Sequence, residues 1–282
     1  MPTKDVPLED EVGDVLEKAM RWAELSTEQI AEATDISPTR ILDAIDYRSD
    51  LNSAELARLA QVLHLNEVGL CSLGNQKYPL PACPGLPFSV HPLRMPHGVG
   101  VANAYVISEP GSNHGILFDT GPSLAALLQN WPSSISHIDI VFLTHIEGEH
   151  TGGLCDVVDY FGISHAYVPG DIKAPCGEPI LEGETKDWNR YQVIAYNTPG
   201  HASSHNCYRI CDRNNGAKSS ELLIAGDLIF AGSIGGSYFC GMLHQQHLKR
   251  LLGLCHESTV IAPGHGPLTT VGNELRFNPF LS

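Results

Sequence analysis

The chain has 282 residues, of which 43% are hydrophobic and 17% are charged, and this composition suits one or two globular domains with a sizeable core. Its formal net charge of −15 opposes binding to phosphate backbones and anionic membranes, so small molecules or proteins are the expected partners. No apolar run reaches the roughly 18 residues that a membrane span needs, and residues 1–14 lack the apolar core of a secretory signal, so we expect a cytoplasmic protein.

Residues 1–75 are predicted to form a compact set of short helices. Apolar residues recur there at helical spacing, and polar capping residues precede the apolar runs. Five helices are expected, which begin near Val12, after the capping box of Ser26 and Gln29, after Ser37 with Pro38 in the first helical position, after Asn52 or Ser53, and near Leu65.

The order of these helices resembles the helix-turn-helix of phage-repressor-type DNA-binding domains, over roughly residues 12–73. The charge of the segment differs from that family, because residues 1–75 hold six basic and fifteen acidic residues. The predicted recognition helix offers Arg40 against Asp43 and Asp46, whereas a DNA reader needs positive charge to neutralise phosphates. We therefore expect a module for packing, homodimerisation or partner docking in preference to DNA binding.

A proline-rich linker is predicted over residues 76–87, because its closely spaced prolines cannot lie inside a helix. From residue 88 to residue 282, short strands alternate with helices, which predicts a second domain of α/β class. Strands are expected at 103–107, 115–121, 138–143, 166–169, 193–196, 222–227 and from 260, and helices at 124–131, 154–161 and 248–255.

Side chains that can bind metal ions follow four of these strands. One strand is followed by four such residues within a six-residue stretch, and three later strands run into one each. Groups at the carboxyl ends of strands converge on one edge of an α/β fold, which is how a preorganised metal site is built. The residues are His145, Glu147, Glu149 and His150 after the first strand, and His201, Asp227 and His265 after the others.

The ordered motifs T-H-x-E-x-E-H, T-P-G-H, G-D and P-G-H-G, preceded by Asp119-Thr-Gly, resemble the metallo-β-lactamase-fold superfamily over roughly residues 88–270. The resemblance implies an αββα sandwich, two sheets packed face to face with helices outside, that holds two metal ions. Asp119 is expected either to orient a ligand histidine or to form a turn, and not to be a ligand itself. By position, metal 1 would take His145, Glu147 and His201, metal 2 would take Glu149, His150 and His265, and Asp227 would bridge them.

The common hydrolase motif of the superfamily is H-x-H-x-D-H, and this chain differs from it twice. Glu147 replaces the second histidine, which resembles the flavodiiron proteins and related oxygen-activating di-iron proteins with H-x-E-x-D-H. A carboxylate in place of an imidazole makes a harder, more anionic site, which favours iron or manganese over zinc. Glu149 replaces the aspartate and is one methylene longer, which predicts a shifted or weaker second metal.

Functions of different classes are compatible with these residues. The resemblance to flavodiiron proteins implies a non-haem di-iron protein that binds, reduces or senses O2, NO or a peroxide. Such a protein would need an external electron donor, because the about 55 residues after Asp227 leave no room for a fused flavin domain. The alternative is a zinc hydrolase of a thioester, lactone or phosphoester, in which Asp227 orients a metal-activated hydroxide. A third reading is a regulator that responds to metal or oxygen. In each, Glu147 and Asp227 are expected to shape the chemistry.

The other histidines, Tyr105, residues 232–236 and the cysteines are not predicted to bind metal. His205 is expected to be either a polar rim residue or a substrate contact, and Tyr105 a core residue. His244 and His247 are predicted to lie at the solvated start of a helix, and residues 232–236 to form a flexible loop. None of the eight cysteines forms a CxxC pair, so all are predicted to be small buried apolar groups without a disulfide framework. They are Cys71, Cys83, Cys155, Cys176, Cys207, Cys211, Cys240 and Cys255.

Overall fold

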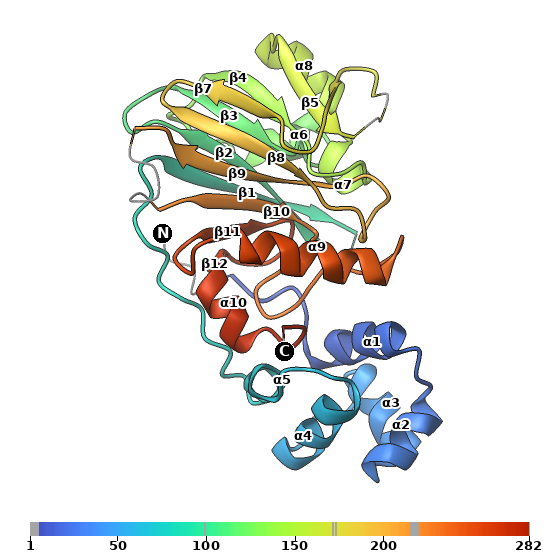
Figure 1. Cartoon of the computed structure of the whole chain (residues 1–282). Helices are drawn as coiled ribbons and strands as arrows, with labels where there is room; N and C mark the ends of the chain where they lie inside the picture. Colours follow the sequence, from blue (N-terminus) through green and yellow to red (C-terminus); the bar gives the residue numbers. More distant parts are fainter. Residues whose placement is uncertain (1–5, 99, 171, 173, 215–219, 282) are drawn as a thin grey trace.

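The computed structural model describes residues 6–98, 100–170, 172, 174–214 and 220–281. Within these ranges the chain has an α/β fold in which two six-stranded sheets pack face to face, with helices on their outer faces (Figure 1). A group of five helices from the N-terminal part of the chain lies at one end of this sandwich. The two-sheet α/β architecture implied by the sequence motifs is therefore present.

The N-terminal helices begin at the capping residues that the sequence predicts. The Ser26 and Ser37 hydroxyls accept from the third backbone N–H of their helices, and Asn52, not Ser53, caps the fourth helix. No helix in the described ranges is long and apolar enough to cross a membrane. The helices are α1 (Val12–Ala23), α2 (Thr27–Thr34), α3 (Pro38–Ile45), α4 (Ser53–Val62) and α5 (Glu67–Gly74).

The first sheet has the strand order β1-β2-β3-β4-β5-β6. The predicted strand at 115–121 ends earlier, because Asp119 turns out of it with a φ of 60°. The strands are β1 (Ser89–His97), β2 (Gly100–Ser108), β3 (His114–Phe118), β4 (His137–Phe142), β5 (His165–Pro169) and β6 (Glu178–Ile180), and the connecting helices are α6 (Leu124–Gln129), α7 (Gly148–Thr151) and α8 (Leu154–Phe161).

The second sheet has the order β12-β11-β10-β9-β8-β7. The predicted helix at 248–255 is the second half of a longer helix that begins at Gly241. The strands are β7 (Thr185–Trp188), β8 (Tyr191–Asn197), β9 (Asn206–Asp212), β10 (Leu222–Gly226), β11 (Val260–Pro263) and β12 (Thr269–Thr270), and the helices are α9 (Gly241–Gly253) and α10 (Val271–Phe277).

The core has three apolar layers, which follow from the two-residue alternation of the strands. In β2, Tyr105 and Ile107 point between the sheets, whereas Ala104 and Val106 pack with α6 and α8. The prediction that Tyr105 is a core residue is confirmed. The third layer lies between the second sheet and α9, and it continues into the N-terminal helices.

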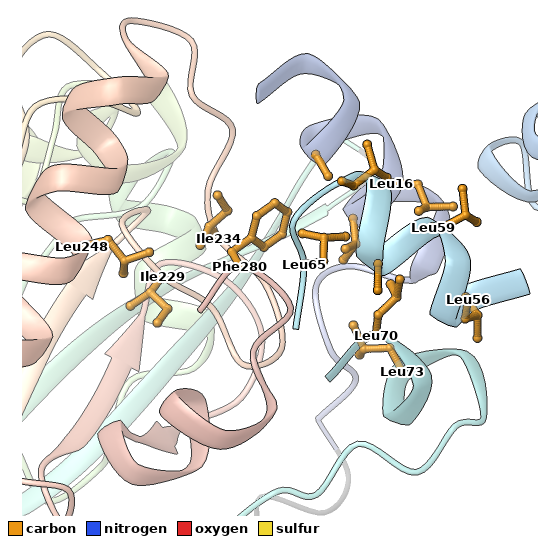
Figure 2. Close-up of a cluster of buried hydrophobic side chains, with 14 of the residues drawn as sticks. Leu16, Leu56, Leu59, Leu65, Leu70, Leu73, Ile229, Ile234, Leu248 and Phe280 are labelled. Carbon is orange, nitrogen blue, oxygen red and sulfur yellow. The ribbon is translucent and has the colours of Figure 1, made fainter. Parts of the chain in front are cut away.

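The N-terminal helices share this third layer with the sandwich. Phe280 and Ile234, from the sandwich, lie in the same buried cluster as Leu16, Leu65 and residues of α4 and α5 (Figure 2). Residues 77–88 connect the two parts and carry no described helix or strand. The division of the chain into 1–75, 76–87 and 88–282 stays a prediction.

The cysteines correct one expectation. Cys155 of α8 and Cys176 form a disulfide, with their Cα atoms 5.5 Å apart. The other six, all in the described part of the chain, are free, and among them only Cys207 is fully buried. Because these two residues are 21 apart in sequence, no local spacing signals their pairing, which depends on how β5 brings the chain back beside α8.

Glu274 of α10 joins the connector, the sandwich and the C-terminal segment. Its buried carboxylate accepts hydrogen bonds from Tyr78 and Thr269 on one oxygen, and from the Gly232 N–H and Asn278 on the other. Burial raises the pKa of this carboxyl group, and the surrounding donors oppose that effect. The contacts tie residue 78 to residues near 232 and 278.

We predict that Glu274→Gln lowers the free energy of unfolding by about 1–3 kcal/mol, because an amide keeps only one of the two acceptor oxygens. Urea denaturation would measure the loss. The control is Glu257→Gln, since Glu257 is exposed and pairs only with Arg276 at the surface. Equal stability of the two variants would contradict the role given to Glu274.

Candidate metal centre

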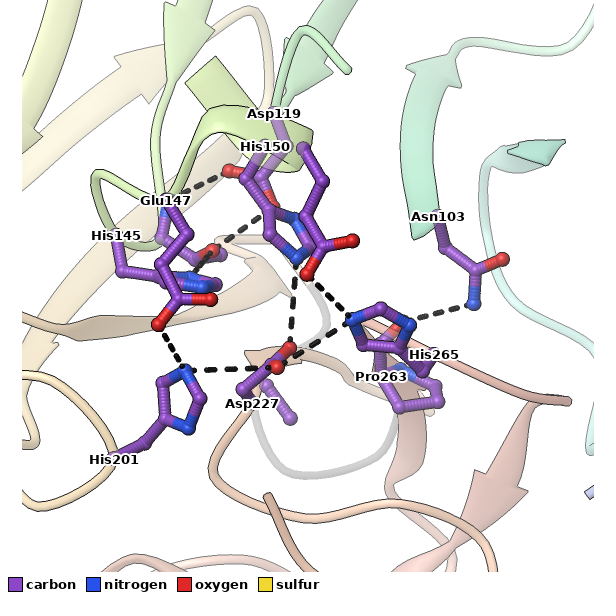
Figure 3. A network of polar contacts seen from close by, with 12 residues as sticks. Asn103, Asp119, His145, Glu147, His150, His201, Asp227, Pro263 and His265 are labelled. Atoms are coloured by element: carbon purple, nitrogen blue, oxygen red, sulfur yellow. Dashed lines mark hydrogen bonds and ion pairs between the residues drawn. The ribbon is translucent and has the colours of Figure 1, made fainter. Parts of the chain in front are cut away.

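The predicted ligand residues lie together at one edge of the sandwich, and Figure 3 shows His145, Glu147, His150, His201, Asp227 and His265 around one centre. Parallel pairing of β3 with β4 and of β10 with β11 places the carboxyl ends of these strands side by side. His145 follows β4, Asp227 directly follows β10, and His265 lies two residues after β11. The edge of the fold that the sequence pattern selects is therefore the edge at which these side chains meet.

The side chains fall into two groups, and within each group the potential ligand atoms lie within 4.8 Å of one another. Asp227 stands between the groups, with one carboxylate oxygen 3.7 Å from His201 Nε2 and 3.5 Å from His265 Nε2. Glu147 is outside both groups, but its Oε1 lies 3.1 Å from His201 Nε2. The groups are His145, His201 and Asp227, and Glu149, His150 and His265.

The buried atoms that face the centre have the chemistry of metal ligands. The Nε2 atoms of His145 and His150 and the Oδ1 atom of Asp227 have no hydrogen-bond partner among the described residues, and His201 Nε2 faces only carboxylate oxygens, the nearer being Glu147 Oε1. Unsatisfied buried polar atoms are costly, so three of them at one centre require an explanation. Divalent cations bound by imidazole nitrogens and carboxylate oxygens would satisfy them, and these residues therefore fit the metal ions that the fold implies.

Each histidine is held in the orientation that points its Nε2 inwards. The Nδ1 atoms of His201 and His265 donate to the carbonyls of Gly236 (2.7 Å) and Val101 (3.1 Å). His145 Nδ1 lies 2.9 Å from the Thr144 hydroxyl, and His150 Nδ1 lies 3.1 Å from Asp119 Oδ2. Such outer contacts fix the ring and its tautomer before a metal binds.

Asp119 occupies the position expected of an orienting residue. Its carboxylate accepts from the Thr144 backbone N–H (2.8 Å) and hydroxyl (2.9 Å) as well as contacting His150. Because the Thr144 hydroxyl donates to Asp119, it accepts from His145. One carboxylate on the turn after β3 thus orients two of the inward-facing histidines.

The electrostatics of the centre depend on Asp227. Burial alone would raise the pKa of its carboxyl group, but the positive charge of His265 and the other histidines holds the pKa well below its usual value. Burial likewise would lower the pKa of His265, whereas the charge of Asp227 raises it to about 9. A fixed anion surrounded by imidazoles is a site where cations can replace protons.

The centre opens into a cleft of about 280 Å³. The wall opposite the sandwich comes from the N-terminal segment and α1, a contribution that sequence reasoning missed because nothing local signals contact with residues so distant in the chain. The cleft is lined by Glu9, Asp10, Asp14, Glu17, Lys18 and Arg21 on that side, and by Glu147, Glu149, His201, Asp227, Phe230, Gly236, Tyr238 and His265 on the other.

Three expectations about the surroundings of the site were wrong. His205 is fully buried and therefore neither lines a rim nor contacts substrate. His244 is also fully buried, because α9 begins earlier than predicted and packs against the sheet, whereas His247 is half-buried. Residues 232–236 are buried and hydrogen-bonded to neighbouring segments, so they form a packed turn and not an exposed flexible loop.

His205 forms a hydrogen bond with the backbone of Asp227. Its Nε2 accepts from the Asp227 backbone N–H at 3.1 Å, and its Nδ1 lies 2.7 Å from the Thr198 hydroxyl. Burial lowers the pKa of His205 well below its usual value, so the ring is neutral, donates to Thr198 and cannot also bind a metal. The sequence pattern H-A-S-S-H does not separate this role from that of His201.

We predict that His205→Phe costs about 1–3 kcal/mol of unfolding free energy, because the ring is kept but the buried Asp227 N–H loses its acceptor. Denaturation in the presence of a chelator would measure this without any contribution from metal. The control is His114→Phe, since His114 is exposed beside Asp139 and a surface substitution is expected to change stability by only about 0.5 kcal/mol. A His205→Phe variant as stable as the control would refute this role.

Comparisons with known proteins agree with this geometry. A Bacillus subtilis protein described as a probable metallo-hydrolase is 27% identical over 214 residues, which cover 67% of this chain and 96% of that protein. The crystal structure of the BLEG-1 B3 metallo-β-lactamase matches with a TM-score of 0.54 and 25% identity, over 67% of this chain and 98% of the other. The structure of TTHA1623 in a di-iron-bound form matches with a TM-score of 0.50 and 26% identity, over 67% and 99%.

The family model of the metallo-β-lactamase superfamily matches residues 97–269. This range is more than half of the chain and contains all seven candidate ligands, whereas helices α1–α5 lie outside it. The order of the motifs, the two packed sheets and the convergence of the ligand residues at one edge agree with the match. The chain belongs to the metallo-β-lactamase superfamily.

Proposed function

We propose that the chain is a dinuclear metalloprotein, with iron favoured over manganese and zinc, that binds, reduces or senses O2, NO or a peroxide. The observation that carries the proposal is the position of Glu147, whose carboxylate lies 3.1 Å from His201 Nε2 and which replaces the second histidine of the common hydrolase motif H-x-H-x-D-H. The proposed ligands are His145, Glu147 and His201 for metal 1, Glu149, His150 and His265 for metal 2, and Asp227 between them.

The choice of metal rests on charge and ligand hardness. Three carboxylates and four imidazoles would surround the two ions, and hard anionic ligands favour iron and manganese more than a nitrogen-rich set does. The structural likeness to a protein solved in a di-iron-bound form supports the same choice. Glu147 is 39% exposed, so its carboxylate borders the cleft as well as His201.

The metal ions and the surrounding residues would have different roles. A bound pair of iron ions would supply the redox chemistry. Asp227 would hold the two ions together, and the outer contacts of the histidines would keep their rings fixed while charge changes at the centre. Glu147, at the open side, would meet the incoming molecule first. An external electron donor would be needed for turnover, and stable binding without turnover would suit sensing.

The second candidate is a metal-dependent hydrolase of a thioester, lactone or phosphoester. A specific observation favours it: a cleft of about 280 Å³ is far larger than a diatomic gas requires, since one water molecule occupies about 30 Å³ of liquid. The Bacillus subtilis relative is also described as a probable metallo-hydrolase. In this hypothesis bound metal ions would lower the pKa of a water molecule, and Asp227 would orient the resulting nucleophile.

The N-terminal helices are proposed to pack or dock a protein, including a second copy of the chain, and not to bind DNA. Arg40 of α3 is engaged internally by Glu55, Ser49 and the Asp50 carbonyl. The other basic residue beside this helix, Arg48, pairs with two aspartates. The positive charge that a DNA reader needs is therefore already neutralised within the segment.

For DNA, we expect no retention of a duplex by the full chain at low ionic strength, where electrostatic binding is strongest. A gel-shift titration with random-sequence duplex would check this. Saturable binding that weakens steeply with added salt would overturn the assignment of the helices to protein contacts.

For the metal, we expect protein produced with iron, manganese and zinc all available to carry about two ions per chain, mainly iron, and to show an iron-dependent optical spectrum. Glu147→His is expected to shift the ratio of bound iron to zinc about tenfold towards zinc. This is about 1.4 kcal/mol of selectivity. Elemental analysis of both proteins would measure the ratio.

The matched control is Glu17→His, which places the same substitution on the cleft wall, where Glu17 pairs with Arg21 instead of a ligand histidine. Two zinc ions without iron in a colourless wild-type protein, together with cleavage of a thioester or lactone under anaerobic conditions, would establish the hydrolase reading instead. An unchanged metal ratio in Glu147→His would remove the argument from that residue.

A further inference from the structure

Helix α1 is fastened to the sandwich beside the metal centre by polar contacts as well as by the shared apolar layer. The Lys18 ammonium donates to the Ile234 carbonyl at 2.7 Å and pairs with Asp10. Asp10 in turn accepts from the Ser233 hydroxyl. All four residues are at least half-buried, so these contacts hold α1 against residues 233–237.

Residues 233–237 themselves border two of the proposed ligands. The Gly236 carbonyl accepts from His201 Nδ1, and a Cβ atom added at Gly235 would lie 1.9 Å from the Asp227 carbonyl oxygen. The backbone of this segment is therefore in direct contact with the backbone of Asp227. Residues 233–237 thus contact α1 on one side and two proposed ligands on the other.

A chain of hydrogen bonds runs from α1 to the backbone beside Asp227. The Trp22 indole N–H donates to the Ser237 hydroxyl at 2.7 Å. Ser237 Oγ lies 3.0 Å from His244 Nδ1, and His244 Nε2 lies 2.7 Å from the Leu228 carbonyl. Leu228 is the residue after Asp227, so the chain ends one residue from a proposed ligand.

The direction of this chain is fixed by chemistry. Burial lowers the pKa of His244 to about 4, so its ring is neutral and carries one N–H. A carbonyl only accepts, which puts that hydrogen on Nε2 and leaves Nδ1 to accept from Ser237. An indole only donates, so Ser237 can supply its hydrogen to His244 while accepting from Trp22. Each group has one consistent role.

His244 also contacts the backbone before the other ligand. Gly200 precedes His201 and has a φ of 154°, and a Cβ atom added there would lie 2.4 Å from His244 Cα. The two backbones are therefore in direct contact. His244 thus touches the neighbours of both His201 and Asp227, and Trp22 holds His244 through Ser237.

We propose that Trp22 of α1 is a positioning residue of the metal centre, which holds His201 and Asp227 in place through Ser237 and His244. The inference rests on the proposed metal binding and extends it to a segment outside the matched family region. Groups that contact metal ligands set metal affinity by fixing the ligands before the metal arrives, and this hydrogen-bond chain acts one step further out, on the backbone of Gly200 and Leu228 beside the two ligands. The N-terminal helices are then part of the metal site, and anything that moves α1 changes how tightly metal is held.

The competing explanation is that Trp22 only packs. Its ring makes edge contacts with His244 (5.9 Å between centroids) and Phe280 (5.2 Å). Trp22→Phe keeps an aromatic ring at this position and removes the N–H, and Ser237→Ala removes the middle of the chain. The matched control is Trp131→Phe, because Trp131 also donates one N–H, to the Ile135 carbonyl at 2.8 Å, and packs on Phe161 away from the centre.

The test measures the dissociation constants of Zn²⁺ and Fe²⁺ for the full chain by competition with a chelator, with Co²⁺ absorption as a second readout of ligand geometry. Trp22→Phe and Ser237→Ala are each expected to weaken metal binding about tenfold. The double variant is expected to bind metal as tightly as the single variant with the lower affinity, because both substitutions break the same hydrogen-bond chain. Trp131→Phe is expected to lose stability while keeping wild-type metal affinity and Co²⁺ spectrum.

The outcomes separate the two proposals. If the wild-type chain binds two ions and Trp22→Phe and Ser237→Ala bind them as tightly as Trp131→Phe does, the positioning role is overturned and the metal site stands. If the two single variants weaken binding additively in the double variant, they act separately, which also overturns it. If the wild-type chain binds neither ion, the proposed function fails and this inference fails with it.

Discussion

The buried carboxylate of Asp227 is the group on which the arrangement of the site depends. It sits between two sets of imidazoles whose charges keep it ionised despite complete burial. Gly264 leaves space for the Asp227 carboxylate, since a Cβ atom at Gly264 would lie 2.0 Å from Asp227 Oδ1. His205 Nε2 accepts a hydrogen bond from the Asp227 backbone N–H. A buried carboxylate is costly unless it is paired with positive charge, and cations are partners that suit such a site.

Much of this could be predicted from the sequence, because the informative residues are local. Capping residues such as Ser26 and Ser37 mark helix starts within three residues, and the strand ends at His145, Asp227 and His265 lie inside short motifs. The orientation of His150 by Asp119 was also within reach, because the turn after β3 has its own Asp-Thr-Gly signal. Each of these features is decided by neighbours in the chain.

The features that could not be predicted from the sequence depend on contacts between distant segments. His205 and His244 have no local mark that separates a buried support from a surface residue, and only packing decides between them. The pairing of Cys155 with Cys176 depends on the path of the chain between α8 and β6. The same is true of α1, whose acidic and basic residues line the cleft although more than one hundred residues separate them from the nearest ligand.

The acidic wall contributed by the N-terminal segment and α1 has a consequence for the approach of molecules to the cleft. Glu9, Asp14 and Glu17 line the cleft together with Lys18 and Arg21, beside a centre that already holds three carboxylates among its proposed ligands. Such a field extends about one Debye length, roughly 8 Å at physiological ionic strength. A field of this sign is expected to speed the arrival of divalent cations, to leave uncharged gases unaffected and to slow anions. The entrance would then discriminate between molecules by charge before contact, and added salt would reduce the difference between these rates.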